Sequence, residues 1–436
     1  MIHQYQNNGY SIVLDVNSGA VHVVDELCYA AIAQLAAGEE PDLAALEKPE
    51  TLEKLQAALG DRYESGQIRE VWEDIKELTR EGRLFTRDVF EPMIDQVKQR
   101  KTVVKALCLH IAHDCNLACK YCFAEEGEYH GRRALMSYEV GKKALDFLIA
   151  SSGNRRNLEV DFFGGEPLMN WQVVKDLVAY GRQQEKLHDK HFRFTVTTNG
   201  VLLNDEIQEF INQEMDNVVL SLDGRREVND AMRPFRNGKG SYDLIVPKFQ
   251  KLADSRNQER YYVRGTFTRN NLDFSNDVLH FADLGFKQMS IEPVVGDESD
   301  PYAIREEDIP KICEEYDRLA KLMIERERER KGFNFFHFMI DLEGGPCVSK
   351  RLSGCGSGTE YLAVTPWGDL YPCHQFVGRE EFLMGNVDEG ITHPEIADEF
   401  RGCSVYSKEK CRSCFAKFYC SGGCMANAYN FHGTIH

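Results

Sequence analysis

The stretch "AHDCNLACKYCF", residues 112–123, decides how the rest of the chain is interpreted. It holds Cys115, Cys119 and Cys122 in a C-x3-C-x2-C run, one ligand short of the four that close a structural zinc site. An apolar, β-branched segment at 103–111, "VVKALCLHI", comes directly before the run and predicts a buried strand. Three cysteines at a strand end favour an iron–sulfur cluster with one free iron over a zinc site or structural thiols.

The residues that follow alternate between apolar strands and helical segments. The strand candidates are 103–111, 158–164, 192–200, 217–224, 261–268 and 287–295, and the helix candidates are 137–151, 170–188, 204–214, 241–254 and 272–284. Regular alternation with near-continuous apolar strands predicts an α/β architecture, with a parallel sheet covered by helices. Six units are too few for a closed eight-stranded barrel, so we expect a partial (β/α)6 barrel at 103–310.

The regions on either side of these units have different patterns. An Asn-Ser-Gly turn within 9–24 predicts a β-hairpin, and helical patterns follow at 25–38, 50–59 and 66–82. We therefore expect an α+β domain at 1–90, a linker at 91–102, a charged helical bridge at 311–343 and a Cys-rich domain at 344–436. The last region has few periodic segments, so metal centres are expected to hold it together.

The composition excludes some classes of partner. A formal net charge of -18 over 436 residues argues against nucleic acid and anionic membranes, which require basic patches. The chain shows neither a signal-peptide pattern nor a long apolar run, so we expect a cytoplasmic protein without a membrane segment. In that reducing compartment, 14 cysteines indicate metal binding or catalysis. The isolated Cys28, Cys108 and Cys313 are instead expected to be buried small hydrophobic side chains.

The segment "CNLACKYC" resembles the signature of the radical S-adenosylmethionine (SAM) superfamily. The resemblance implies that Cys115, Cys119 and Cys122 hold a catalytic 4Fe–4S cluster whose free iron binds SAM, and that SAM cleavage gives a 5′-deoxyadenosyl radical. It also implies that the aromatic residue before the third cysteine, Tyr121, packs near the adenine of SAM.

A second motif of the superfamily, "GGEP" at 164–167, follows the second strand candidate. The resemblance implies that Gly164 and Gly165 let the backbone approach the methionine end of SAM, because glycine has no side chain to obstruct it. Glu166 is expected to accept a hydrogen bond from the ammonium group of SAM. The alternative for this motif is an ordinary turn.

Three single residues complete the expected SAM site. The resemblance places Asn199 of "TTNG" near the ribose or carboxylate of SAM, and Ser221 of "SLDG" at the end of the next strand. Arg264 matches a position that contacts the SAM carboxylate, as charge pairing suggests. Asn199 and Ser221 are alternatively turn caps, and Asp223 has either a turn or a substrate-contacting role.

The distal cysteines closely resemble the SPASM extension of radical SAM enzymes that modify peptides. The resemblance implies an outer auxiliary cluster on Cys411, Cys414 and Cys420, and an inner one on Cys355, Cys373 and Cys424. The family signature ends in one more cysteine after this set, which the 436 residues do not contain. Cys403 is the candidate to complete the outer cluster and Cys347 the inner one, each being otherwise a free thiol. Without Cys347, the inner cluster has an open iron for a substrate thiolate.

Residues 1–90 resemble a small winged-helix-like peptide-recognition domain, which adds a leader peptide as an extra strand. Joined to this barrel, the N-terminal text looks most like the maturases of SCIFF (six cysteines in forty-five residues) peptides. That resemblance implies an enzyme that links cysteine sulfur to a carbon atom of threonine, as a thioether, in a ribosomal precursor peptide. The expected reductant is flavodoxin or ferredoxin. The alternatives are a formylglycine-generating, sulfatase-maturing enzyme and, in another class, a zinc-stabilised peptide-binding scaffold.

Overall fold

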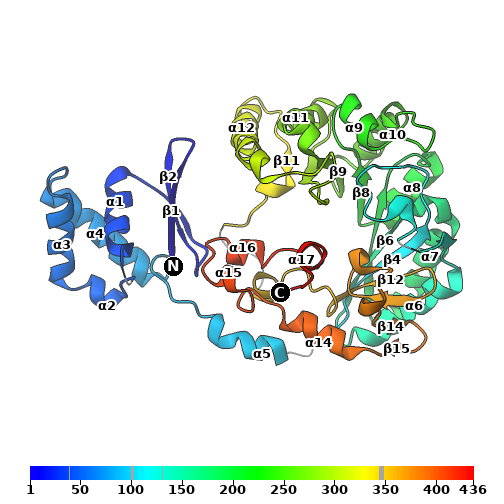
Figure 1. The fold of residues 1–436 in the computed structure, drawn as a ribbon, viewed down its shortest axis with the longest axis horizontal. Coiled ribbons are helices and arrows are strands. Elements are labelled where there is room, and N and C mark those ends of the chain that lie inside the picture. The colour runs from blue at the N-terminus through cyan, green and yellow to red at the C-terminus, as the bar shows by residue number, and fades with distance from the viewer. Residues whose placement is uncertain (39, 100–102, 130, 343–347) are drawn as a thin grey trace.

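The computed structural model describes residues 1–38, 40–99, 103–129, 131–342 and 348–436 (Figure 1). One of the predicted cluster ligands, Cys347, lies outside the described residues. The N-terminal unit and the large parallel sheet lie at opposite ends of the view, with C-terminal helices between them. Within the described ranges, no helix combines the length and the apolar character needed to span a bilayer.

A three-stranded antiparallel sheet begins the chain, with strand order β1-β2-β3. Its strands are β1 Ile2–Asn7, β2 Tyr10–Asp15 and β3 Val21–Val24, and the helices after it are α1 Glu26–Ala36, α2 Leu43–Leu46, α3 Pro49–Leu59 and α4 Ser65–Arg80. The predicted hairpin is β2–β3. The pattern did not predict β1, which reaches β2 through the two-residue turn Asn8-Gly9, both with positive φ (50° and 85°). The apolar helix faces pack on Val13 of β2, which gives this unit a core of its own.

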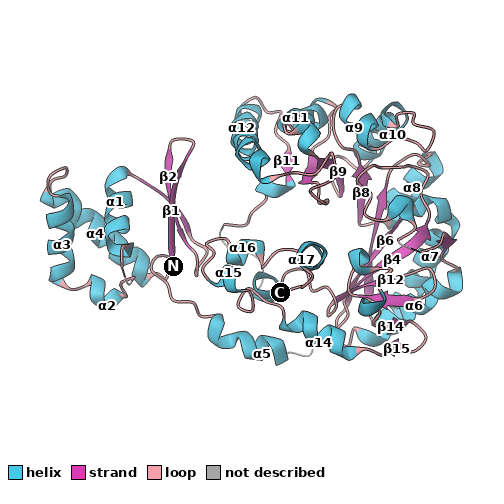
Figure 2. Ribbon diagram, in the orientation of Figure 1, coloured by secondary structure: helices cyan, strands magenta, loops and turns pink. Residues whose placement is uncertain are grey.

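Six parallel strands form the centre of the structure, in the order β10-β9-β8-β7-β6-β4 (Figure 2). They are β4 Ala106–His113, β6 Asn157–Gly164, β7 His191–Thr198, β8 Asn217–Ser221, β9 Tyr261–Phe267 and β10 Gln288–Pro293. The helices outside the sheet are α6 Tyr138–Ser151, α7 Trp171–His188, α8 Asp205–Glu214, α9 Arg226–Met232, α10 Tyr242–Ser255, α11 Ser275–Asp283 and α12 Ile309–Arg328. The α/β fold expected from the alternating pattern is confirmed.

The parallel sheet extends past these six strands at both edges. β11 Asn334–Phe335 pairs with β10, and β12 Tyr361–Val364 pairs with β4, both in parallel. Because β12 comes from the Cys-rich region, that region shares a sheet with the barrel. The expected limits of the domains stay a prediction, although one continuous sheet joins the barrel to the Cys-rich region.

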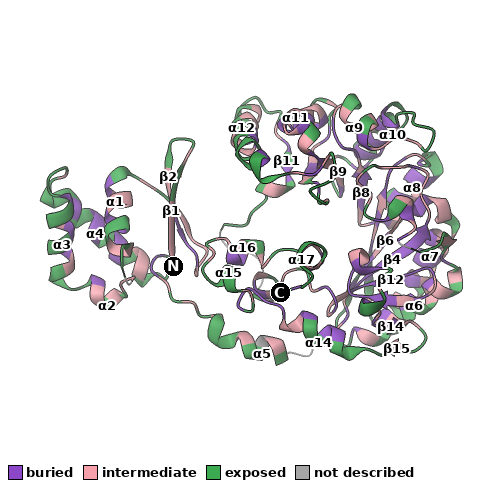
Figure 3. Ribbon diagram, viewed as in Figure 1, coloured by how far each residue is buried: buried purple, intermediate pink, exposed green. Residues whose placement is uncertain are grey.

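Side chains alternate between the two faces of the barrel strands. On β6, Leu158, Val160 and Phe162 are fully buried towards the helices, whereas Asp161 and Phe163 point to the inner face. Figure 3 shows the buried residues gathered in the sheet and on the helix faces turned towards it. On β6, the inner face therefore carries a carboxylate beside an aromatic ring, whereas the face towards the helices is apolar.

The Cys-rich region is built from short elements. They are β13 Asp369–Tyr371, β14 Gly385–Asn386, β15 Gly390–Ile391, α13 Val348–Ser353, α14 Pro394–Gly402, α15 Glu409–Arg412, α16 Lys417–Cys420 and α17 Met425–His432, and the connector before the barrel holds α5 Ile94–Gln99. β12 and β13 form an antiparallel hairpin whose turn contains Gly368, with φ +92°. This hairpin explains the wide spacing of the first two distal cysteines: Cys355 precedes it, Cys373 follows it, and the hairpin returns the chain to the same end.

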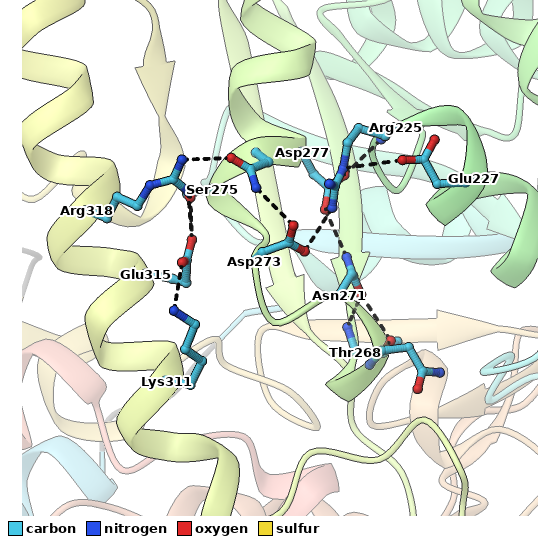
Figure 4. Close-up of polar contacts among 12 residues, drawn as sticks. Arg225, Glu227, Thr268, Asn271, Asp273, Ser275, Asp277, Lys311, Glu315 and Arg318 are labelled. Atoms are coloured by element: carbon cyan, nitrogen blue, oxygen red, sulfur yellow. Dashed lines mark hydrogen bonds and ion pairs between the residues drawn. The ribbon is translucent and has the colours of Figure 1, made fainter.

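A polar network ties α11 and α12 to the loops after β8 and β9 (Figure 4). The buried carboxylate of Asp277 accepts from the backbone nitrogen and Nε of Arg225, at 2.9 and 2.8 Å, and from Asn271 Nδ2 at 3.1 Å. Ser275, at the start of α11, donates to Glu315 of α12. These contacts hold the loops at the carboxyl ends of the strands, where the candidate site lies.

The N-terminal unit packs against the Cys-rich region through a buried ion pair. Lys417, only 4% exposed, places Nζ 2.9 Å from Asp88, and the Tyr406 hydroxyl donates to the same carboxylate at 2.7 Å. Burial alone would raise the pKa of Asp88, but hydrogen bonds from Tyr406 and Lys417 hold it below its ordinary value. Nearby, the rings of His3 and Phe415 stack with centroids 3.8 Å apart, so β1 touches the loop that carries the outer cysteines.

Candidate active site

The three-cysteine loop leaves β4 at the carboxyl edge of the barrel. Cys115, Cys119 and Cys122 are partly buried free thiols. Two N–H groups point at the sulfur of Cys115: the Leu117 backbone nitrogen at 3.5 Å and Asn199 Nδ2 at 3.6 Å. Donors of this kind stabilise negative charge on cluster sulfurs and tune their potential.

A segment after α9 clamps the loop from outside. The backbone nitrogens of Ala118 and Lys120 donate to the carbonyls of Pro234 and Met232, each at 2.9 Å. Arg236 Nη2 donates to the carbonyl of Cys115 at 2.7 Å and pairs with the neighbouring Asp114. The sequence pattern did not predict this contact, because residues 232–236 carry no motif.

The two glycines of "GGEP" allow backbones to meet. A Cβ built on Gly164 would lie 2.4 Å from the carbonyl oxygen of Ala112, and one on Gly165 would lie 2.1 Å from that of Asp114. Gly164 also has φ +120°, which favours glycine. The motif therefore packs directly on the backbone that enters the cysteine loop, and its predicted contact with SAM stays a prediction.

Glu166 joins two strand ends. Its carboxylate accepts from the Leu168 nitrogen at 3.0 Å, the Thr198 hydroxyl at 2.8 Å and the Asn199 nitrogen at 2.8 Å. Burial raises the pKa of Glu166, and these hydrogen bonds oppose the rise. The structure thus shows that Glu166 orients "TTNG" relative to "GGEP". Contact with the SAM ammonium remains an expectation.

Tyr121 belongs to a buried triad with Asp223 and Arg233. The Tyr121 hydroxyl donates to Asp223 at 2.6 Å and accepts from Arg233 Nη1 at 2.8 Å, and Asp223 is fully buried. Burial raises the pKa of Asp223, while the nearby Arg233 counteracts it. In this structure the carboxylate fixes the ring of Tyr121, and the choice between a turn role and a substrate-contacting role stays a prediction. Arg233 lacks a motif, so only the tertiary structure reveals its role.

Ser221 and Arg264 are register partners on β8 and β9, both on the inner face. The Arg264 side chain is exposed to the barrel interior, and its charge acts on Glu292 and His374 from across the sheet. Asn199 points into the same interior, where its Nδ2 also donates to Asn116 Oδ1 at 2.8 Å. Among the described residues, the buried amide nitrogen of Asn116 has no hydrogen-bond partner, which leaves a donor for an acceptor that binds here.

Sequence reasoning missed Asp161, which lies on the inner face of β6. Removal from water and the charge of Glu159 together raise its pKa to about 7, against the effect of a hydrogen bond from Thr195, which lowers it. Cys108 of β4 is paired with Asp161 in the sheet register, and the Tyr361 side chain of β12 forms a hydrogen bond with the Cys108 thiol. A carboxyl with a pKa near neutrality is suited to exchange a proton with a bound substrate. The available signal was one Asp within an apolar strand.

The distal cysteines gather into the two sets that the resemblance implied. The pKa of Cys373 is raised to about 12 by burial and by the charges of Cys355 and Cys424. Burial, with Cys414 and Cys420 close by, similarly raises the pKa of Cys411. Cys424 therefore lies near Cys373, in the set that the resemblance assigned to the inner cluster.

The remaining cysteines depart from expectation in several places. The thiol of Cys403 is 1% exposed and donates to the Ile435 carbonyl at 3.1 Å, yet Cys411 is near, so its ligand role stays a prediction. Cys108 is buried as expected. Cys313 is exposed and Cys28 is half-buried, so the expectation of burial is wrong for Cys313, because α12 turns that position to solvent.

The donor set around the first loop fits a cluster with an open iron. Burial raises the pKa of Cys115 to about 12 and that of Cys119 to about 11, and Arg233 opposes the second shift. Burial thus favours the protonated thiols when no metal is bound. Bound iron would favour the thiolates instead, and the N–H donors would help to stabilise their charge. Among the described residues, no three His, Cys, Asp or Glu side chains converge closely enough to bind a single metal ion.

Comparison with known proteins points in the same direction. The 4Fe-4S single cluster domain family matches residues 104–246. The radical SAM cyclopropyl synthase TigE of Paramaledivibacter caminithermalis is 21% identical over 346 residues, which is 76% of this chain and 70% of that protein. A cysteine-type anaerobic sulfatase-maturating enzyme of Clostridium novyi is 24% identical over 331 residues, 72% of this chain and 86% of that protein.

A likeness to a solved structure extends over nearly the whole chain. Streptococcus suis SuiB, bound to S-adenosylmethionine, superimposes with a TM-score of 0.54 at 16% identity, covering 98% of this chain and 95% of that one. The chain therefore shares its fold with SuiB, and its three-cysteine loop lies within the residues that match the 4Fe-4S single cluster domain. In sequence it is similar to a radical SAM cyclopropyl synthase and to a sulfatase-maturating enzyme, and the SAM-binding cluster and the SPASM-type clusters stay predictions.

Proposed function

We propose that this chain installs thioether crosslinks, from cysteine sulfur to a carbon of threonine, in a ribosomally made cysteine-rich precursor peptide, as SCIFF maturases do. The observation that carries the proposal is the N-terminal sheet-and-helix unit, seated against the Cys-rich region through Asp88 and Lys417. SuiB, which shares the fold along nearly the whole chain, has also been solved with its precursor peptide SuiA. A peptide substrate explains why such a unit is joined to a radical SAM barrel.

The leader of that peptide would bind along the N-terminal sheet. β3 is an edge strand in the described sheet, and Val23 on it is 66% exposed. A hollow of about 480 Å³ lies at the end of the hairpin and includes Val24, Asp25 and Glu26 in its wall. An extended leader can add to such an edge through backbone hydrogen bonds, and acidic groups beside it favour a leader with basic residues.

The residues of the chain have separable roles in the proposed reaction. When bound, the cluster and SAM supply a 5′-deoxyadenosyl radical for hydrogen abstraction. Leu117 and Asn199 hold the sulfur of Cys115 by N–H donors, and Glu166 keeps Asn199 in place. The radical takes one hydrogen atom from the threonine carbon, and the Asp161 carboxylate receives the proton of the substrate thiol, for which its pKa of about 7 is suited. An auxiliary cluster would take the one electron that is left when the C–S bond forms.

Two auxiliary clusters complete the proposal. Cys411, Cys414 and Cys420 would hold the outer cluster, and Cys355, Cys373 and Cys424 the inner one, with Cys403 and Cys347 as candidate fourth ligands. If Cys347 does not bind, the inner cluster keeps an iron to which the substrate thiolate can coordinate. The ring centroids of His374 and Phe123 are 5.6 Å apart. Because His374 follows Cys373 and Phe123 follows Cys122, this contact supports an inner cluster close to the first cysteine loop.

The test uses a short cysteine-rich peptide encoded beside the gene, incubated with the anaerobically reconstituted protein, SAM and dithionite. Mass spectrometry should show a loss of two hydrogens per crosslink, located between a cysteine and a threonine. The Cys115→Ala variant, which loses one cluster ligand, serves as the control and should leave the peptide unchanged. A peptide that gains methyl groups, or SAM cleavage without any peptide product, would overturn the proposal.

A second candidate is formylglycine formation, favoured by the 24% identity to the Clostridium novyi sulfatase-maturating enzyme, which spans 72% of this chain. A sulfatase-derived peptide with a central cysteine separates the two candidates. Its conversion to a carbonyl that reacts with hydrazides would favour the second candidate. Conversion of the cysteine-rich peptide alone would favour the first.

A further inference from the structure

A cavity of about 440 Å³ lies beside Cys355, where four parts of the chain meet. α5 contributes Lys98 to its wall, α13 contributes Lys350, and the loop before β6 contributes Arg155. Cys355, the first distal cysteine, lies in the same wall and is exposed. The proposed inner cluster would therefore be reached from solvent through this cavity.

The charge of the cavity is opposite to that of the chain. Its lining contains five cationic side chains and one carboxylate; the five are Lys98, Lys105, Arg155, Lys350 and Arg401. Lys105 pairs with that carboxylate, Glu360, and Arg401 pairs with Asp398 outside the lining. The other three cations form no ion pair with any described residue. In a chain with a net charge of -18, this is a local positive field that attracts an acidic partner.

Two buried donors in the same wall lack acceptors. Ser404 is 3% exposed and its Oγ has no hydrogen-bond partner among the described residues, and the same holds for Nε of Arg401. Both residues line the cavity. Buried donors are nearly always satisfied in folded proteins, so their pairing is expected to come from a group that enters the cavity. A carboxylate oxygen supplies the acceptors that both donors require.

We propose that this cavity is the docking point of an acidic electron-transfer protein of the flavodoxin class. Acidic side chains of the carrier enter the cavity and pair with Lys98, Arg155 and Lys350, while its redox group stops near Cys355. A cationic cavity of this kind suits a transient, charge-steered encounter. One electron leaves the reduced carrier and one is gained by the inner cluster, with no bond formed and no proton moved. This inference rests on the proposed auxiliary cluster at Cys355.

The test compares the wild-type protein with the K98E/K350E double variant, both full length and reconstituted anaerobically. Isothermal titration with a purified, acidic bacterial flavodoxin should show binding that weakens roughly tenfold or more in the variant. Wild-type affinity should also fall with added salt, because the attraction is screened. Flavodoxin-driven formation of 5′-deoxyadenosine without peptide should show a raised KM for flavodoxin. With dithionite as reductant, the same variant should match the wild type.

A matched control changes the same number of charges elsewhere. K321E/K331E reverses two exposed lysines on α12 and the loop after it, away from the cavity, and should leave flavodoxin affinity unchanged. Equal affinity in wild type and K98E/K350E would overturn the proposal, as would an equal loss in the control, which would indicate non-specific attraction. Because these assays contain no peptide, flavodoxin affinity and SAM cleavage can still be interpreted if the proposed peptide crosslinking is wrong. Normal iron content in the variants shows that they fold.

Discussion

At the scale of single residues, the site is organised by buried hydrogen bonds between motifs. Glu166 binds Asn199, and Asn199 in turn reaches the sulfur of Cys115. Tyr121 is held by Asp223 and Arg233 in the same way. Three motifs that lie far apart in the chain are thus locked around one loop, so small substitutions should change cluster properties before they change the fold.

Asn199→Ala removes one N–H donor from Cys115 and should lower the reduction potential of the SAM cluster by on the order of tens of millivolts. The sign follows because an N–H···S contact favours the reduced, more negative cluster. An EPR-monitored redox titration measures the change. Asn212→Ala, on the exposed face of α8, is the control and should leave the potential unchanged. A raised potential in Asn199→Ala would contradict the contact.

Asp161 should make the chain less stable as pH rises. Its pKa is raised to about 7 in the fold, whereas an unfolded Asp titrates near its ordinary value, about 3.9. Between these values the folded state holds the extra proton, so stability falls from about pH 4 to about pH 7 and then levels off. Asp161→Asn should therefore gain on the order of 4 kcal/mol relative to wild type between pH 4 and pH 8.

Thermal unfolding of the metal-free chain at several pH values measures this difference. Glu53→Gln, an exposed carboxylate on α3, serves as the control and should show little pH-dependent gain. A constant difference between Asp161→Asn and wild type across the range would mean that Asp161 titrates normally. The same variant in the loaded enzyme should slow peptide conversion more than SAM cleavage, if Asp161 accepts the substrate proton.

At the scale of elements, close backbone packing explains the most restrictive part of the sequence. "GGEP" follows β6 directly and lies against the strand end that feeds the cysteine loop. Gly368 has a comparable role in the β12–β13 hairpin, where Val387 leaves no room for a side chain. Gly164 and Gly165 let two backbones approach, whereas Gly368 leaves room for the side chain of Val387. The distances to neighbouring backbone atoms identify them, whereas glycine content alone does not.

Gly165→Ala should displace the cysteine loop, since its Cβ would lie 2.1 Å from the Asp114 carbonyl oxygen. We expect a loss of roughly 1–3 kcal/mol in stability and incomplete loading of the SAM cluster. Iron content and circular dichroism measure both effects. Gly66→Ala is the control: it lies in α4 with no atom within 4 Å of its Cβ, and alanine favours a helix. Full iron content in Gly165→Ala would refute the packing argument.

At the scale of the whole molecule, the Cys-rich region connects the other two parts. β12 extends the barrel sheet by pairing with β4, while Tyr406 and Lys417 hold the N-terminal unit. The outer cysteine loop also carries Phe415, on which His3 of β1 stacks. The β1 edge of the N-terminal sheet therefore lies next to the proposed outer cluster.

Removing Asp88 should loosen this connection. In Asp88→Ala, Lys417 stays buried without its partner, which costs roughly 3–5 kcal/mol. The depressed pKa of Asp88 means that the native pair contributes stability at neutral pH and loses it as pH falls through the folded pKa. Hydrogen exchange should increase in residues 1–24 and 404–420. Lys251→Ala, which breaks an exposed pair, should cost no more than about 1 kcal/mol, and equal exchange in both variants would contradict the prediction.

Three clusters of four irons predict about 12 Fe per chain in anaerobically reconstituted protein. The triple variant Cys115→Ala/Cys119→Ala/Cys122→Ala should retain about 8, and a triple alanine variant of Cys411, Cys414 and Cys420 should do the same. Iron and sulfide analysis, checked by Mössbauer spectroscopy, gives the counts. Zinc in place of iron, or a total near 4 in the wild type, would contradict three clusters.

The sequence by itself determined the local features of this protein. Hydrophobic periodicity located six barrel strands, and the tight spacings identified the cysteine loop, "GGEP" and the distal cysteine sets. These features can be predicted because helix and strand patterns and metal-ligand spacings depend on residues that are close together in the sequence. The pattern did not reveal β1, whose turn of Asn8 and Gly9 is short, or the helix within the connector.

Only the tertiary structure decided which distant groups share a site. Asp161 and Arg233 carry no motif, and their importance arises from burial beside partners contributed by other strands and loops. The pairing of β12 with β4, the contact of Lys417 with Asp88 and the basic cavity at Cys355 likewise join segments hundreds of residues apart. Such contacts depend on how the sheet closes and how its ends pack, and no periodicity or spacing in a single chain encodes those long-range distances.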